Sequence, residues 1–170
     1  MNVNYYNGFG KIYFNKIIEK IISIANLEDD NKVILDFGCG AKYLEKKLNK
    51  KILNYDINPI YSELKNYKNS YFNIVIFNHV LMYMHENKIN ETLNSIKEKN
   101  SSCRIVVGIG RMTIINKIAS WLSLNFSAHT GATTSPNNQL KILLQHLDLL
   151  SSKSVFGLTD VYYFKFKSSS

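Results

Sequence analysis

The segment VILDFGCGAKYL, residues 33–44, decides the fold class of this chain. Its first five residues form an apolar run, interrupted by Asp36, that is typical of a buried strand. Gly38 and Gly40 follow, and glycines at a strand end let the backbone pass close to a ligand. A short helix is predicted over Tyr43–Asn49, with free N–H groups near its start. The segment therefore predicts a strand, a ligand-binding turn and a helix.

Strand and helix patterns alternate along the rest of the chain. The predicted strands are residues 33–37, 51–56, 72–78, 104–109, 153–156 and 161–166. The predicted helices, read from apolar repeats, are residues 12–25, 43–49, 89–96, 114–122 and 136–147. This alternation predicts an α/β fold, with a doubly wound, mostly parallel sheet, helices on both faces and an antiparallel strand pair at the C-terminal end.

The length of 170 residues predicts a single domain. It divides into an N-terminal helical segment (1–30), a Rossmann-like core (31–167) and a serine tail (168–170). No apolar run reaches the ~18 residues that would cross a bilayer, so no membrane span is expected. The first residues lack a secretory pattern and the two cysteines form no disulfide framework, which predicts a cytoplasmic protein.

The formal net charge of +8 raises the question of an anionic partner. The lysines are scattered, and their densest group, Lys46, Lys47, Lys50 and Lys51, fits the solvated face and end of a helix. The chain is also rich in Asn, Lys, Ile and Tyr, as an AT-rich coding bias produces. The composition favours solubility over nucleic-acid binding, and RNA stays an alternative partner.

A second acid, Asp56, ends the strand after the glycine turn, 20 residues beyond Asp36. At that spacing a carboxylate can accept hydrogen bonds from both hydroxyls of a ribose. A dinucleotide fingerprint starting at Gly38 would need glycine or alanine where Tyr43 stands, so NAD is disfavoured. No phosphate-binding G-x-x-x-x-G-K-S/T loop is present, which argues against an ATPase. These residues predict a site for an adenosine-containing ligand.

Three stretches, VILDFGCG, NYDINP and FNIVIFNHVLMYM, resemble the first, second and fourth motifs of the class I S-adenosylmethionine-dependent methyltransferases. The resemblance spans roughly residues 33–166 and implies S-adenosyl-L-methionine as the cofactor. It implies that Asp36 lies near the methionine amino group and that Asn78 approaches the methionine end with its backbone carbonyl. The other cofactor-binding residues that it implies are Gly38, Cys39 and Gly40 along the cofactor, Asp56 at the ribose hydroxyls and Ile57 against adenine.

Two features depart from the pattern of that family. Lys42 stands where the family usually has a third glycine, and we expect its side chain to point outward from the mouth of the site. Residues 60–71 are too few for the usual helix, strand and further acidic turn, and can supply about one helical turn. The third strand of the usual fold is therefore predicted to be missing or reduced, which trims the adenine pocket.

Two histidines are candidate catalytic residues, because a base is needed when the methyl acceptor must lose a proton. His79 follows the fourth-motif strand, and His129 lies in the loop before residues 135–136. Packing or surface roles are open alternatives for both. Tyr5 and Tyr6 could form a lid or pack on the core or its edge. Trp121 is interpreted as a packing residue, with a substrate-side role as the alternative. No Cys and His cluster has metal-ligand spacing, so no metal is predicted.

The leading functional hypothesis is methyl transfer from S-adenosylmethionine to a small molecule or a glycan precursor. One alternative is an RNA methyltransferase that uses its basic surface to bind phosphate. Another is a non-catalytic binding or scaffold protein with a degenerate methyltransferase fold. The methyl acceptor, the attacked atom and the oligomeric state stay open at this stage.

Overall fold

The computed structural model describes residues 9–111 and 132–168. The elements in chain order are α1 (Phe9–Ile24), β1 (Ile34–Phe37), α2 (Tyr43–Leu48), β2 (Leu53–Tyr55), η2 (Tyr67–Asn69), β3 (Ile74–Asn78), η3 (Leu81–Tyr83), α3 (Glu86–Lys99), β4 (Arg104–Gly110), α5 (Pro136–His146), β5 (Leu147–Val155) and β6 (Thr159–Phe166). The predicted helix over 114–122 and the candidates Tyr5, Tyr6, Trp121 and His129 lie outside the described residues.

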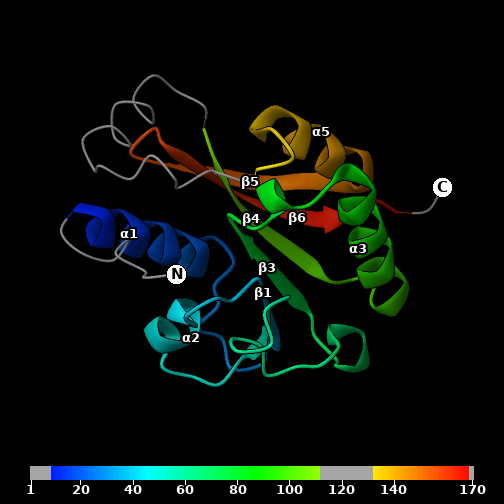
Figure 1. The fold of residues 1–170 in the computed structure, drawn as a ribbon, viewed down its shortest axis with the longest axis horizontal. Helices are drawn as coiled ribbons and strands as arrows, with labels where there is room; N and C mark the ends of the chain where they lie inside the picture. Colours follow the sequence, from blue (N-terminus) through cyan, green and yellow to red (C-terminus); the bar gives the residue numbers. More distant parts are fainter. Residues whose placement is uncertain (1–8, 112–131, 169–170) are drawn as a thin grey trace.

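The six strands form one sheet in the order β2-β1-β3-β4-β6-β5 (Figure 1). Strands β2, β1, β3 and β4 are parallel, and β6 pairs antiparallel with both β4 and β5. The predicted α/β class and its C-terminal antiparallel strand pair are confirmed. Strand β2 pairs with one edge of β1, and β3 pairs with the other edge, so the direction in which strands are added reverses at β1. In open α/β sheets, ligands bind beyond the carboxyl ends of the strands at such a reversal.

Two hydrophobic layers cover the two faces of the sheet. On one face, α1 and α2 pack on residues such as Ile34, Ile76 and Val106. On the other face, α3 and α5 pack on the alternate residues of the same strands. Because side chains alternate along a strand, Asp36 and Asn78 share the α1 face with these buried residues.

The third strand of the usual fold is absent from the described residues, as predicted. Residues 60–71 contain only the single turn η2. Their backbone nevertheless lies along the outer edge of β2, where the N–H groups of Glu63 and Leu64 donate to Asn54 O at 3.0 and 3.3 Å. An irregular segment therefore covers the edge that a strand would otherwise pair with.

The largest difference from the predicted elements lies at the C-terminal end. Strand β5 begins at Leu147, whereas the sequence pattern predicts a strand from residue 153 and a helix through residue 147. The run LDLLSSKSV does not alternate apolar and polar residues, because β5 is an exposed edge strand with an irregularity between Leu149 and Ser151. Within the described ranges, no helix is both long and apolar enough to cross a bilayer.

Candidate functional site

The glycine turn is held against the end of β2 by its own backbone. The N–H groups of Gly38 and Cys39 donate to Tyr55 O at 2.7 and 3.2 Å. Gly38 has φ +81°, and a Cβ there would lie 2.5 Å from Val80 Cγ2. Gly40 also has a positive φ, +46°, but nothing lies within 4 Å of its Cβ position. Gly38 is therefore required by close packing, whereas Gly40 borders open space.

Asp56 joins the end of β2 to this turn. Its Oδ2 accepts a hydrogen bond from Gly40 N at 3.0 Å, and its Oδ1 accepts one from Asn58 N at 2.9 Å. A carboxylate oxygen has two lone pairs, so each oxygen can accept one more hydrogen bond from a ligand. The next residue, Ile57, is 94% exposed and offers an apolar surface beside Asp56.

Asp36 lies at the same edge of the sheet, on β1, and is 5% exposed. Burial first, and then the negative charges of Asp56 and Glu45, raise the pKa of its carboxyl group to about 7. Among the described residues, none donates a hydrogen bond to this carboxylate. A cationic ligand group at this edge would stabilise its charged form.

We expect the stability of the ligand-free protein to reflect this pKa. In the unfolded chain Asp36 loses its proton near pH 4, whereas in the folded chain it keeps the proton until about pH 7. Its contribution to the free energy of unfolding therefore falls as pH rises from about 4 to about 7, by about 1–4 kcal/mol. Urea unfolding of wild type and Asp36→Asn at several pH values measures the difference.

Asp36→Asn has no carboxyl group to titrate at this position. The free energy of unfolding of wild type, relative to that of Asp36→Asn, should therefore decline from about pH 4 to about pH 7. Asp148→Asn, which removes a half-exposed carboxylate from edge strand β5, is the matched control. A pH-independent difference between wild type and Asp36→Asn would contradict the raised pKa.

Asn78 ends β3 and pairs in register with Gly108 of β4. Its side-chain Oδ1 is buried and has no hydrogen-bond partner in the described structure. A Cβ at Gly108 would lie 2.8 Å from this oxygen, so glycine leaves room for the amide. Buried acceptors are nearly always paired, and an unpaired one at a sheet edge fits a ligand that donates a hydrogen bond.

His79 follows Asn78 with φ +56° and lies beneath α1. Its Nε2 is 3.3 Å from Thr159 Oγ1, which also hydrogen-bonds the hydroxyl of Tyr13. The imidazole ring packs edge-on against Phe14 and lies 3.4 Å from the Cβ position of Gly110. Strand β4 extends to Gly110, one residue beyond the predicted strand 104–109, and its glycines Gly108 and Gly110 make space for Asn78 and His79.

The side chain of Lys42 is partly exposed and forms an ion pair. Its Nζ lies 2.6 Å from Glu63 Oε1, on the segment that covers β2. Lys42 has φ +59° and precedes α2, so it adopts the left-handed conformation that glycine usually provides. For a residue with a side chain this conformation costs about 1–2 kcal/mol. The backbone geometry explains the usual glycine, and the ion pair gives lysine a contact that glycine lacks.

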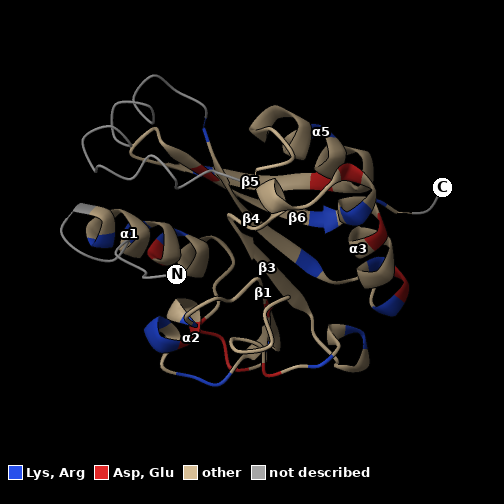
Figure 2. Cartoon of the chain, in the orientation of Figure 1, with Lys and Arg blue, Asp and Glu red and all other residues tan. Residues whose placement is uncertain are grey.

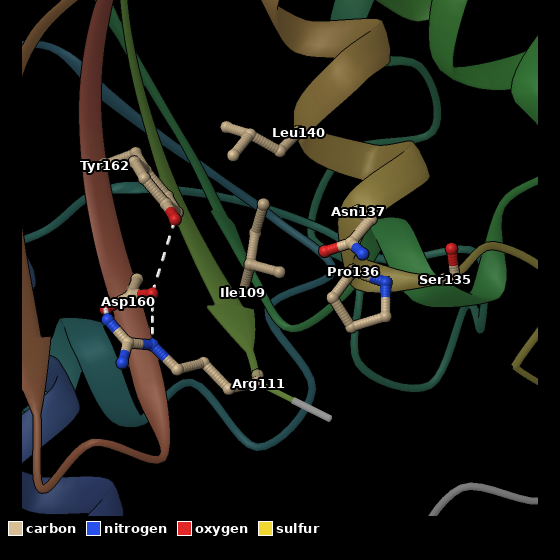
Figure 3. A pocket seen from close by; sticks show the side chains of 9 residues that line it. Ile109, Arg111, Ser135, Pro136, Asn137, Leu140, Asp160 and Tyr162 are labelled. Atoms are coloured by element: carbon tan, nitrogen blue, oxygen red, sulfur yellow. Dashed lines mark hydrogen bonds and ion pairs between the residues drawn. The ribbon is translucent and has the colours of Figure 1, made fainter. Parts of the chain in front are cut away.

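A cavity of about 340 Å³ lies between the end of β4 and the first turn of α5 (Figure 3). Arg111 and Asp160 form a two-point ion pair at its wall, with Nε–Oδ2 and Nη2–Oδ1 distances of 2.6 and 2.7 Å. Tyr162 donates to Asp160 Oδ2 at 3.3 Å. The remaining lining residues are Ile109, Gly110, Ser135, Pro136, Asn137 and Leu140. No sequence motif marks this cavity, because it forms only when α5 packs against the sheet.

Lys and Arg residues are spread over several elements of the described chain (Figure 2). Several of them are paired with acids: Lys16 and Lys47 with Glu19, and Lys42 and Lys51 with Glu63. In the described ranges, no group of three or more His, Cys, Asp or Glu side chains could hold a metal ion. These four lysines therefore form local ion pairs on the described surface.

Comparison with known proteins relates the chain to others by structure alone. No family model and no curated protein matches its sequence. Magnesium protoporphyrin IX methyltransferase from Synechocystis, solved with bound SAH, has a TM-score of 0.60 and 14% identity, over 95% of this chain and 88% of that one. The N-methyltransferase NodS from Bradyrhizobium japonicum has a TM-score of 0.59 and 14% identity, over 88% and 87%.

A third similar structure is described as a pericyclic reaction enzyme, with a TM-score of 0.56 and 14% identity, over 88% of this chain and 47% of that one. The sheet order, the absent third strand and the antiparallel pair β5–β6 match a trimmed version of the fold of the methyltransferase neighbours. This chain has the fold of the class I S-adenosylmethionine-dependent methyltransferases.

Proposed function

We propose that this protein binds S-adenosylmethionine and transfers its methyl group to a small molecule. The observation that carries the proposal is the pair of acceptors without donors, Asp36 and Asn78, at the carboxyl edge of the sheet. The ammonium group of the methionine moiety is a hydrogen-bond donor and a cation, so it would donate to both side chains and stabilise the charged form of Asp36. The open space at Gly40, next to Asp56, supports the same ligand.

The remaining contacts follow from the positions of the site residues. Asp56 would accept hydrogen bonds from the two ribose hydroxyls with the lone pairs that Gly40 and Asn58 leave available. Exposed Ile57 would lie against adenine. Cys39 supports the turn from inside, because its Sγ donates to Tyr61 O at 3.6 Å and its pKa is raised to about 12, mainly by burial. A neutral thiol of this kind has no nucleophilic role.

S-adenosylmethionine supplies an activated methyl group, and the protein supplies its orientation toward the acceptor. We place His79 as the proton acceptor for substrates that must lose a proton, with its ring held by Thr159 and Phe14. His129 stays a second candidate on sequence grounds alone. We further propose that the acceptor enters from the side of β4, where the 340 Å³ cavity has a volume typical of small-molecule sites.

Two measurements test this function. Calorimetric titration with S-adenosylhomocysteine should give a saturable site, and no binding at millimolar ligand would instead support the scaffold alternative. Incubation of a cell extract with methyl-labelled S-adenosylmethionine should then move label into compounds that pass a small-pore filter. Label retained with RNase-sensitive material, together with RNA binding that weakens with salt by a log-log slope near −0.7 per phosphate contact, would favour the RNA alternative.

A further inference from the structure

The segment 60–71, which stands in place of the missing strand, is attached to the cofactor side of the site. Tyr61 O accepts from Cys39 Sγ on the glycine turn. Ser62 Oγ accepts from Asp56 N at 3.1 Å and donates to Leu64 O at 2.7 Å. The same short loop therefore contacts both the turn and the backbone of the proposed ribose-binding acid.

Glu63 is the charged centre of this loop. It accepts hydrogen bonds from Lys42 Nζ at 2.6 Å and from Lys51 Nζ at 2.8 Å. The hydrogen bond from Lys42, followed in size by the one from Lys51, lowers the pKa of Glu63 to about 2. The side chains of Lys42 and Glu63 are 29% and 31% exposed, whereas that of Lys51 is 73% exposed. The pair with Lys42 is thus the better shielded of the two.

The backbone of Lys42 belongs to the glycine turn. Its N–H donates to Cys39 O at 2.9 Å, and its carbonyl accepts from Lys46 N as α2 begins. Its side chain then spans to Glu63, whose own N–H donates to Asn54 O on β2. A glycine at this position would fit the left-handed backbone but would leave the turn and the loop without this link.

We propose that the Lys42–Glu63 ion pair is a positioning device for the cofactor site, which takes over the role of the missing third strand. It holds residues 61–64 against β2 and so fixes Asp56 toward the ribose. The role in cofactor binding rests on the proposed function. The hold on the loop does not, because it concerns the ligand-free protein.

The test combines Lys42→Gln, Glu63→Gln, the double variant and the conservative Lys42→Arg. Hydrogen exchange of the Glu63 and Leu64 amides, measured without ligand, should accelerate about two- to fivefold in both single variants. The dissociation constant for S-adenosylhomocysteine should rise by a similar factor. The double variant should exchange no faster, and bind S-adenosylhomocysteine no more weakly, than the more affected of the two single variants. Lys42→Arg should resemble wild type in both measurements.

The matched control is Lys47→Gln, which breaks a lysine–glutamate pair between α2 and α1, away from the loop. It should leave both exchange and affinity unchanged. Unaltered exchange in Lys42→Gln, or losses that add in the double variant, would overturn the proposal. If wild type binds no S-adenosylhomocysteine, the proposed function fails and the positioning role fails with it, while the exchange data alone decide whether the pair holds the loop.

Discussion

Replacement of Asp56 with alanine is expected to weaken S-adenosylhomocysteine binding by about 100-fold or more. Two hydrogen bonds from ribose hydroxyls to a carboxylate are worth about 1.5–3 kcal/mol each, and both would be lost. The variant would also release Gly40 N and Asn58 N from their acceptor, which loosens the turn that borders the ligand. Isothermal titration calorimetry measures the affinity directly.

Two companion variants separate these effects. Asp56→Asn keeps one oxygen acceptor and should bind with an intermediate affinity. Asp148→Asn removes a carboxylate from edge strand β5 and should bind like wild type. Thermal unfolding without ligand shows whether each variant is folded. If folded Asp56→Ala binds within about threefold of wild type, Asp56 does not contact the ribose.

The substitution Gly38→Ala is expected to lower the free energy of unfolding by about 2–4 kcal/mol. One part is backbone strain, because φ +81° is unfavourable for alanine. The larger part is overpacking, because the new Cβ would lie 2.5 Å from Val80 Cγ2 and 2.8 Å from Val80 Cβ. Urea unfolding with a two-state fit measures the loss.

Gly157→Ala is the control for strain alone. Gly157 has φ +68° and nothing within 4 Å of its Cβ position, so the loss there should be about 1 kcal/mol. In a Val80→Gly background, Gly38→Ala should cost a similar small amount, because the clashing side chain is gone. Equal losses in Gly38→Ala and Gly157→Ala would show that contact with Val80 is not what requires glycine at position 38.

The fold of this chain serves more than one kind of reaction. The similar structures include a methyltransferase named for magnesium protoporphyrin IX, an N-methyltransferase and an enzyme described by pericyclic chemistry. One scaffold supports many reactions because its chemistry depends on side chains at the sheet edge and on the acceptor pocket. Binding and transfer measurements on this chain therefore distinguish among these reactions.

The sequence predicted the parts of the fold that depend on local patterns. Buried parallel strands read as short apolar runs, so the strands around Asp36, Asp56 and Asn78 were found within about two residues. The missing third strand followed from simple length, because residues 60–71 are too few to form a helix and a strand. The early start of β5 was missed, because an exposed edge strand has little hydrophobic signal.

The sequence by itself determined the strand–turn–helix of residues 33–44, the sheet class and the set of residues that gather at its carboxyl edge. Each of these follows from backbone propensity and side-chain periodicity over a few residues. Only the tertiary structure decided that Asn78 has a buried acceptor without a partner, that His79 lies beneath α1, and that Lys42 binds Glu63. These features depend on how the helices and strands pack, because each is set by residues that are far apart in the chain.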